Sequence, residues 1–190
     1  MNSYRTPKGS KTIVLDRDGV INQDSSTYIK SAEEWIPISG SIDAIARLHQ
    51  ANFRVIIASN QSGIARGYFD EAALTRMHDK MNSLVEDSGG VISAIFYCPH
   101  SPDAGCSCRK PKTGLLERAE VEFDISLAGD YFVGDSLKDL QAATSFNMKP
   151  ILVRTGNGRQ TEVALSKEIR DQTRIFNDLE SAVTWILNKQ

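Results

Sequence analysis

The chain has 190 residues, of which 41% are hydrophobic and 24% are charged, and its formal net charge is -2. This length suffices for one domain that buries roughly 70% of the surface of the unfolded chain, and the composition excludes a disordered protein. The balanced charge excludes a broad basic surface, so we expect no binding to nucleic acid or to an anionic membrane. No run approaches the ~18 apolar residues of a membrane span and the start lacks a secretory signal, so we expect a cytoplasmic protein.

Five short runs rich in β-branched residues predict strands, at 11–15, 53–59, 93–98, 130–134 and 150–154. The runs are almost continuously apolar, which is typical of strands covered on both faces in a parallel sheet. Helical patterns lie between them, around 42–49, around 74–85, from 136 onward and over 179–187. Alternating strands and helices predict an α/β fold, with a doubly wound parallel sheet sandwiched by helices.

Caps and stops support two of these helices. Asp70 is placed to cap the helix around 74–85 and Gly89 to end it, while Ser136 and Asp139 have the spacing of a capping box. We divide the chain into a flexible N-terminal tail at 1–12 and a single domain at 13–190. Residues 156–176 are too polar for a helix or strand to be placed there.

Polar segments follow four of the predicted strands. They are Asp16 and Asp18 in "IVLDRDGV", "SNQSG" at 59–63, "CRKP" at 108–111 and "GDSLKD" at 134–139. Because parallel strands end at one edge of a sheet, we expect these segments to meet in one site. Two carboxylates directly after a buried strand are costly in desolvation and repulsion, which favours a chemical role for them. An ordinary polar turn is the alternative for that segment alone.

Transfer of a phosphoryl group explains these residue types. Mg²⁺ prefers oxygen ligands, which Asp16, Asp135 and the backbone carbonyl of Asp18 would supply. Asp16 would then attack phosphorus and form an aspartyl phosphate, while the side chain of Asp18 would donate and later accept a proton. Ser59 and Lys110 would hold the phosphoryl oxygens.

Each of these residues also has a purely structural interpretation. Ser59 could be a hydrogen-bonding residue at a strand end, Lys110 a solvated charge, and Asp135 a helix cap. Asp139 fits a capping box as well as it fits catalysis, so we leave it out of the metal set.

The three cysteines fall within eleven residues, together with a histidine, in "CPHSPDAGCSC". Cys98, His100, Cys106 and Cys108 form a complete tetrahedral set for a structural Zn²⁺, with no open position for water. An odd number of thiols argues against a disulfide, and the remaining alternatives are buried free cysteines or a chance cluster. A zinc-stapled loop here would hold the basic residues that follow it near their target.

In this order, the D-x-D-G segment, the strand-end Ser, the Lys and the G-D pair resemble the motifs of the haloacid dehalogenase-like phosphatases. The resemblance covers residues 12–139 and implies a Rossmann-like phosphatase domain with no large cap domain. With the zinc loop and "SNQSGIARG", the chain is similar to the branch of that family that removes the C7 phosphate of a heptose bisphosphate. That branch is Mg²⁺-dependent, commonly monomeric, and acts in the synthesis of lipopolysaccharide precursors.

The resemblance also implies where the sugar bisphosphate would bind. The implied contacts are Arg17, Asp24, Ser25, Ser26, Thr27, Asn60, Gln61, Ser62 and Arg109, and Arg66 is a further candidate because its charge suits a second phosphate. Ser136 stands where some relatives have a basic residue, so the anomer preference stays open. A histidinol-phosphate phosphatase is the alternative substrate class, and a non-catalytic zinc-stapled interaction module is the alternative of another kind.

Overall fold

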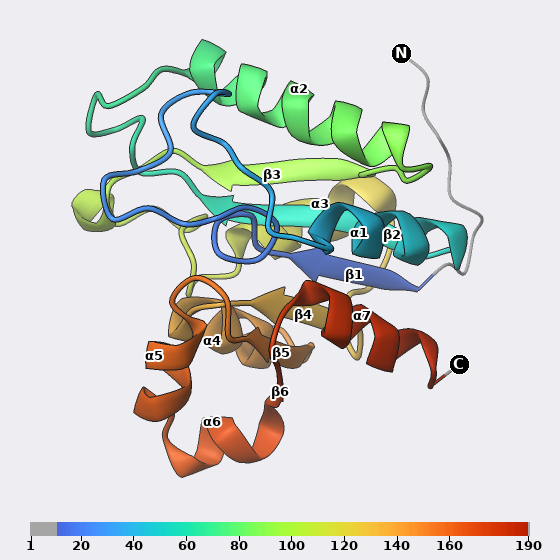
Figure 1. The fold of residues 1–190 in the computed structure, drawn as a ribbon. Coiled ribbons are helices and arrows are strands. Elements are labelled where there is room, and N and C mark those ends of the chain that lie inside the picture. Colours follow the sequence, from blue (N-terminus) through green and yellow to red (C-terminus); the bar gives the residue numbers. More distant parts are fainter. Residues whose placement is uncertain (1–10, 190) are drawn as a thin grey trace.

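The computed structural model describes residues 11–189. Six strands form one parallel sheet in the order β3-β2-β1-β4-β5-β6, and Figure 1 shows it between helices. The strands are β1 (Thr12–Leu15), β2 (Arg54–Asn60), β3 (Ala94–Cys98), β4 (Tyr131–Gly134), β5 (Lys149–Val153) and β6 (Arg174–Phe176). The order reverses between β1 and β4, and an open sheet of this kind binds its ligands at that switch point.

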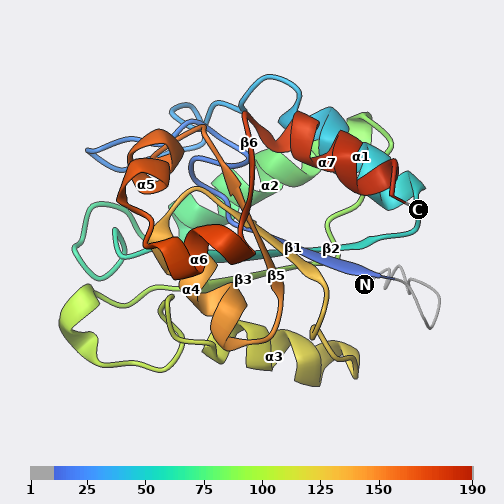
Figure 2. The same cartoon turned by 90° about the horizontal axis from the view of Figure 1, so that it is seen from below.

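The helices are α1 (Ser41–Gln50), α2 (Glu71–Asp87), α3 (Gly114–Phe123), α4 (Leu137–Ser145), α5 (Gly158–Ala164), α6 (Lys167–Gln172) and α7 (Leu179–Leu187), and a 3₁₀ turn covers Pro102–Ala104. Two hydrophobic clusters, one on each face of the sheet, show which helices cover which face. Ile13 and Leu15 pack in the cluster that α1, α2 and α7 share, whereas Val14 packs in the cluster of α3 and α4. Figure 2 shows α1 and α7 on the side of the sheet opposite α3. The predicted doubly wound sheet, covered on both faces, is confirmed.

The predicted caps are found. The side chain of Asp70 accepts a hydrogen bond from the backbone N–H of Ala73 at 2.7 Å, and a carboxylate oxygen of Asp139 accepts one from the backbone N–H of Ser136 at 3.1 Å.

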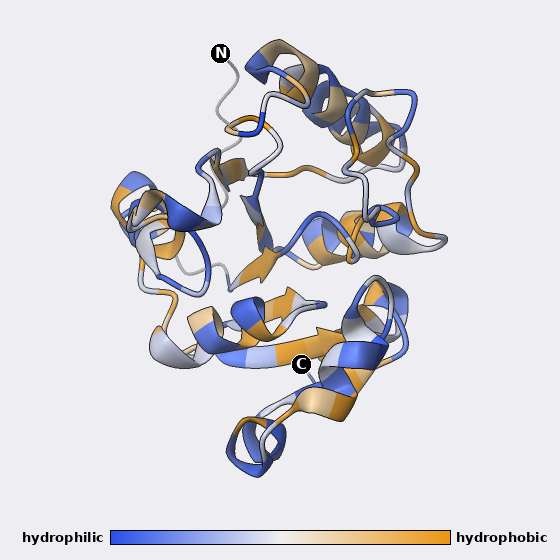
Figure 3. Cartoon of the chain, turned by 90° about the vertical axis from the view of Figure 1, so that its left-hand side faces the viewer, coloured by the Kyte–Doolittle hydropathy of each residue, from blue (hydrophilic) through white to orange (hydrophobic). Residues whose placement is uncertain are grey.

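Figure 3 views the molecule from the side that the carboxyl ends of the strands face. The helices in this view carry hydrophilic and hydrophobic residues side by side.

The structure differs from the sequence-based expectations at three places. β1 begins at Thr12, which the expected tail includes, because Thr12 pairs with Arg54; residues 1–10 of that tail lie outside the described residues. The segment left unplaced at 156–176 contains α5, α6 and β6. α3 was not predicted from the sequence. Its apolar residues do not all lie on one face, since Val121 is 84% exposed, and this weakens the helical pattern. Among residues 11–189, no helix has the length and apolar character needed to cross a membrane.

Candidate active site

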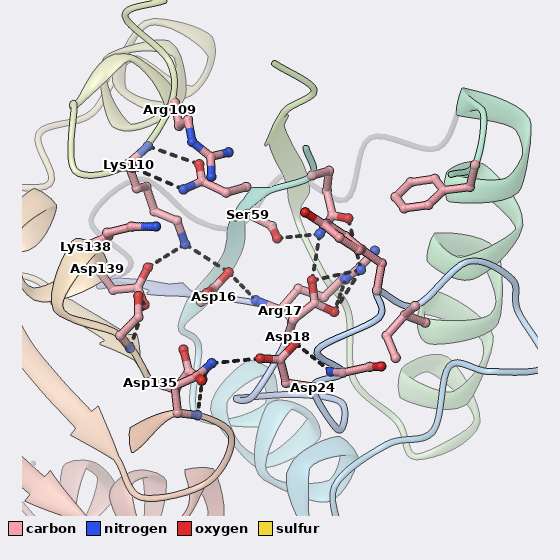
Figure 4. A pocket seen from close by; sticks show the side chains of 18 residues that line it. Asp16, Arg17, Asp18, Asp24, Ser59, Arg109, Lys110, Asp135, Lys138 and Asp139 are labelled. Carbon is pink, nitrogen blue, oxygen red and sulfur yellow. Dashed lines mark hydrogen bonds and ion pairs between the residues drawn. The ribbon is translucent and has the colours of Figure 1, made fainter. Parts of the chain in front are cut away.

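A cavity of about 230 Å³ lies at the carboxyl ends of β1, β2 and β4. It therefore lies at the switch point where the sequence pattern predicts a site. Residues from all four polar segments line it, as Figure 4 shows for the labelled side chains. The lining residues are Asp16, Arg17, Asp18, Asp24, Ser25, Tyr28, Ile29, Ser59, Asn60, Gln61, Phe69, Arg109, Lys110, Asp135, Ser136, Lys138, Asp139 and Asn157.

Lys110 joins two carboxylates at the base of the cavity. Its Nζ lies 2.9 Å from Oδ1 of Asp16 and 2.6 Å from Oδ1 of Asp139, and it donates to the carbonyl of Ala58 at 2.7 Å. The lysine is only 3% exposed, so it is no solvated charge. Burial alone would lower the pKa of Lys110, but Asp139 and Asp16 together raise it above its ordinary value.

Three carboxylates gather around this lysine. Oxygens of Asp16, Asp135 and Asp139 all lie within 4.8 Å of one another. Burial, followed by the charges of Asp16 and Asp139, raises the pKa of Asp135 to about 8. Burial likewise raises the pKa of Asp16 to about 7, although Lys110 opposes this shift. One ammonium group against three carboxylates leaves an excess of negative charge, and an all-oxygen set of this kind fits a hard divalent cation.

Asp135 is held by the loop that follows β5. The backbone N–H of Asn157 donates to Oδ2 of Asp135 at 2.7 Å, and the side-chain amide of Asn157 donates to the same oxygen at 3.2 Å. Gly19 has a φ of 77°, and a Cβ at either Gly19 or Gly156 would collide with the Asp135 carboxylate. Glycine at these two positions therefore lets two loops close around Asp135.

Asp18 is surrounded by donors. Arg17 contacts both carboxylate oxygens of Asp18, at 2.8 and 2.9 Å, Asn22 donates to Oδ1 at 2.9 Å, and Gln61 donates to Oδ2 at 2.8 Å. Burial would raise the pKa of Asp18, but Arg17 and the amide donors hold it below its usual range. These contacts favour the ionised form of the Asp18 side chain.

The amides of "SNQSG" contact other protein groups. Asn60 donates to the carbonyl of Lys110 at 3.1 Å and accepts from the N–H of Lys110 at 3.0 Å. Gln61 donates to Ser59 at 2.8 Å. Both residues line the cavity at which they were expected, with their polar groups engaged in hydrogen bonds to protein residues.

Four of the implied substrate contacts are not among the lining residues, and their role as substrate contacts stays a prediction. Ser26, Thr27 and Arg66 are exposed in loops, and Ser62 is buried in the turn after β2. Arg66 is an exposed residue in a turn in which its backbone N–H donates to the carbonyl of Ser62 at 3.1 Å. Arg109, Asp24 and Ser25 do line the cavity.

Several lining residues were not predicted for the site. The sequence left Asp139 undecided between a helix cap and a catalytic residue. In the structure Asp139 is 1% exposed and contacts Lys110. Asn157 lies in the loop between β5 and α5, at the same edge of the sheet as Asp16 and Asp135, so the rule that found those two residues points to this loop as well. Loops bring Tyr28, Ile29 and Phe69 to the cavity, and the sequence contains no comparable signal for them. Lys138 lies in the first turn of α4, within the polar segment at 134–139.

The four zinc-ligand candidates come together in the loop after β3. Sγ of Cys98 lies 3.6 Å from both Nδ1 of His100 and Sγ of Cys106, and Nδ1 of His100 lies 3.3 Å from Sγ of Cys108. Zn–S bonds of about 2.3 Å would separate ligands in a tetrahedron by roughly 3.8 Å, so the spacing fits. Burial raises the pKa of Cys98 to about 12, and a coordinated metal ion would offset that cost of ionisation.

A doubly wound sheet that gathers a D-x-D-G segment, a lysine and further carboxylates at its switch point defines a haloacid dehalogenase-like hydrolase. In agreement, the family model described as "HAD-hyrolase-like" matches residues 107–182. The D-glycero-beta-D-manno-heptose-1,7-bisphosphate 7-phosphatase of Pseudomonas aeruginosa is 51% identical over 175 residues, which are 92% of this chain and 97% of that protein. The enzyme of the same name from Neisseria meningitidis serogroup A is 46% identical, covering 94% and 96%. The chain therefore belongs to the family of D-glycero-beta-D-manno-heptose-1,7-bisphosphate 7-phosphatases.

Solved structures agree with this membership. The crystal structure of D,D-heptose 1,7-bisphosphate phosphatase from B. bronchiseptica, in complex with magnesium and phosphate, has a TM-score of 0.90 and 49% identity, and the match covers 95% of this chain and 99% of that chain. The corresponding enzyme of Burkholderia thailandensis has a TM-score of 0.72 and 40% identity, with 93% and 98% covered.

Proposed function

We propose that this chain is a Mg²⁺-dependent phosphatase that removes the C7 phosphate of D-glycero-β-D-manno-heptose 1,7-bisphosphate, as a cytoplasmic monomer that acts in the synthesis of lipopolysaccharide precursors. One observation carries the proposal: Asp16, Lys110, Asp135 and Asp139 form a buried group at the switch point. The 51% identity to an enzyme of that name supports the choice of substrate.

The carboxylates of Asp16 and Asp135 and the backbone carbonyl of Asp18 are the groups that would hold Mg²⁺, and Asp139 lies close enough to join them. When bound, the ion would neutralise negative charge on the transferring phosphoryl group. The thiolates of Cys98, Cys106 and Cys108 and the imidazole of His100 would hold a structural Zn²⁺.

Asp16 is the proposed nucleophile. Its Oδ1 accepts hydrogen bonds from the N–H of Arg17 at 2.7 Å and from Lys110 at 2.9 Å, and these bonds fix the orientation of the carboxylate. A bond forms between Asp16 and phosphorus as the bond from phosphorus to the sugar oxygen breaks, which yields an aspartyl phosphate. Lys110 and Ser59 contact the phosphoryl oxygens as charge develops on them.

Asp18 is the proposed acid and base. In its protonated form it gives its proton to the departing sugar oxygen, and the resulting carboxylate then takes a proton from the water that attacks the aspartyl phosphate. The second step regenerates Asp16 and releases inorganic phosphate. The donors around Asp18 favour its ionised form, which matches the second step.

The charges at the rim of the cavity support a bisphosphate. Arg109 and Lys138 line the cavity, and a second phosphate gains from these cations, whereas the amine of histidinol phosphate is repelled by them. We therefore expect a higher kcat/KM for the heptose bisphosphate than for histidinol phosphate in parallel assays. The opposite preference would refute the substrate assignment.

Phosphate release distinguishes the enzyme from the interaction module. With Mg²⁺ present, we expect turnover by the purified chain, and we expect EDTA or Asp16→Asn to reduce it to background. The exposed Asp87 of α2 offers a matched control, because Asp87→Asn removes the same charge far from the cavity. Equal background release by all samples would favour a non-catalytic module.

A further inference from the structure

The side chain of Gln61 lies between two residues of the proposed machinery. Its Nε2 donates to Oγ of Ser59 at 2.8 Å and to Oδ2 of Asp18 at 2.8 Å; Ser59 and Asp18 are labelled in Figure 4. The residue is only 4% exposed. Its backbone N–H donates to the carbonyl of Cys98 at 2.7 Å, which ties its position to the end of β3.

The surroundings determine which way the amide of Gln61 points. Its Oε1 accepts a hydrogen bond from the guanidinium of Arg17 at 3.2 Å. A flipped amide would place Oε1 against the Asp18 carboxylate and the NH₂ group against the Arg17 guanidinium, which is unfavourable at both contacts. Both N–H bonds of the amide are thus used within the protein, so neither is left for a substrate.

This amide determines what the Ser59 hydroxyl can do. A serine hydroxyl has one proton to donate. Because Oγ of Ser59 accepts the hydrogen bond from Gln61, the proton of Ser59 stays available for a group in the cavity, which Ser59 lines. Under the proposed function, that group is an oxygen of the transferring phosphoryl group.

The same amide restrains Asp18. Arg17 donates to both carboxylate oxygens of Asp18 and Asn22 donates to Oδ1, while Gln61 adds a second donor at Oδ2, from an amide that also contacts Ser59. The carboxylate is therefore held in one rotamer, at a fixed place relative to the Ser59 hydroxyl. One amide group thus links the hydroxyl that contacts the phosphoryl group to the carboxylate that handles the proton of the leaving group.

We propose that Gln61 is a positioning residue of the phosphatase reaction, which orients the Ser59 hydroxyl as a donor to the phosphoryl group and fixes the Asp18 carboxylate beside it. The proposal rests on the proposed function, because it needs a phosphoryl group in the cavity. It replaces the role of substrate contact that the family resemblance implies for Gln61.

Gln61→Met tests the proposal, since methionine has a similar length and no amide. Losing a donor to a developing oxyanion costs about 10²- to 10³-fold in kcat, and misorienting that donor costs less, so we expect kcat/KM to fall about 30-fold. Gln61→Glu should fall further, because a carboxylate would capture the Ser59 proton and repel Asp18. Gln50→Met, at the exposed end of α1, is the control and should leave kcat/KM unchanged.

A double-mutant cycle separates positioning from a general loss of structure. If Gln61 acts through Ser59 and Asp18, Gln61→Met should cost less than about 5-fold in a Ser59→Ala background and also less in an Asp18→Asn background. Full additivity with both would overturn the proposal, as would wild-type kcat/KM in either folded Gln61 variant. Thermal melting identifies the variants that are folded at the assay temperature.

Binding of inorganic phosphate with Mg²⁺, measured by calorimetry, keeps this test apart from the proposed function. A wild-type chain that releases no phosphate from either substrate refutes the proposed function. Even then, the Gln61→Met chain should bind phosphate about tenfold more weakly than wild type, since a misoriented Ser59 donor weakens a charge-assisted hydrogen bond. Equal affinities would overturn the role of Gln61.

Discussion

The proposed catalytic cluster and the candidate zinc loop are built in different ways. Asp16, Lys110, Asp135 and Asp139 come from three separate segments of the chain; the buried ends of β1 and β4 place Asp16 and Asp135, and the first turn of α4 places Asp139. The four candidate zinc ligands come from eleven consecutive residues, of which only Cys98 belongs to a strand and is buried. The hydrophobic core therefore holds the cluster in place, whereas the loop has little core of its own, and we expect its order to depend on a bound metal.

This difference predicts different responses to damage. Changes in the cluster should act on catalysis first, because the strands hold the remaining groups in place. Changes in the loop should act on stability and on substrate binding, because the loop carries Arg109 toward the cavity.

Lys110→Met should have the largest effect. It removes the cation that contacts both Asp16 and Asp139, so kcat should fall about 10³-fold, and the loss of one partner from a buried ion group costs about 3–5 kcal/mol. Steady-state kinetics and thermal melting measure the two effects. Lys167→Met, at an exposed site on α6, is the control. A kcat within tenfold of wild type would show that the lysine is not part of the catalytic cluster.

Asp139→Asn decides between capping and catalysis. Asparagine can still accept the hydrogen bond from the Ser136 N–H, but it lacks the charge that lies 2.6 Å from Lys110. We expect kcat/KM to fall about 10²-fold, together with a weaker apparent affinity for Mg²⁺.

Asp178 provides the matched control for that substitution. It caps α7 in a second capping box, in which it accepts from the N–H of Ser181 at 2.8 Å. Asp178→Asn should leave kcat/KM unchanged within about twofold, because that cap touches no part of the cavity. If both variants behave alike, Asp139 has only a structural role.

Cys106→Ser should act on the zinc loop alone. Loss of a zinc ligand should lower Tm by about 10 °C and raise KM several-fold, while kcat changes little because the cluster of carboxylates stays in place. Metal content by mass spectrometry and thermal melting check the prediction. The exposed Ser107 supplies the control Ser107→Ala. A zinc content equal to that of wild type would contradict the ligand assignment.

The contrast also explains how far the sequence predicts the fold. Apolar runs and helical patterns are sufficient for β1 to β5 and for α1, α2, α4 and α7, because burial against the sheet leaves a strong signal. β6 has three residues, and α5 and α6 are short and polar. These elements form through their contacts with β5 and its neighbours, which local sequence does not encode.

The same distinction applies to the site. Strand ends predict where Asp16, Ser59 and Asp135 meet, because the position depends only on topology. The partners of an amide depend on side-chain rotamers, so Asn60 and Gln61 were placed correctly near the cavity without the hydrogen bonds that they make. Arg66 was chosen for its charge, and charge alone does not indicate whether a residue in a turn lines the cavity.

Asp130 tests whether a carboxylate outside the cluster affects stability without affecting catalysis, and its expected effect is the smallest. It is a partly buried carboxylate at the other end of β4, away from the cavity. Burial raises the pKa of Asp130 to about 6. The backbone N–H of Thr12, which donates to Asp130 at 3.3 Å, has the opposite effect and lowers this pKa. The folded chain therefore binds this proton more tightly than the unfolded chain does, and the stabilisation present below pH ~4 is lost as the pH rises through about 6.

Asp130→Asn should consequently stabilise the protein at pH 7 by about 1 kcal/mol, after allowance for solvent screening at a half-buried site, with Tm about 3 °C higher. The gain should vanish below pH ~4, where Asp130 is protonated in both states. Thermal melting across this pH range measures it, with kcat expected to stay at the wild-type value. A gain that is independent of pH would mean that packing rather than charge is responsible. A loss of kcat would show that the two ends of β4 are coupled, against the separation between cluster and scaffold argued above.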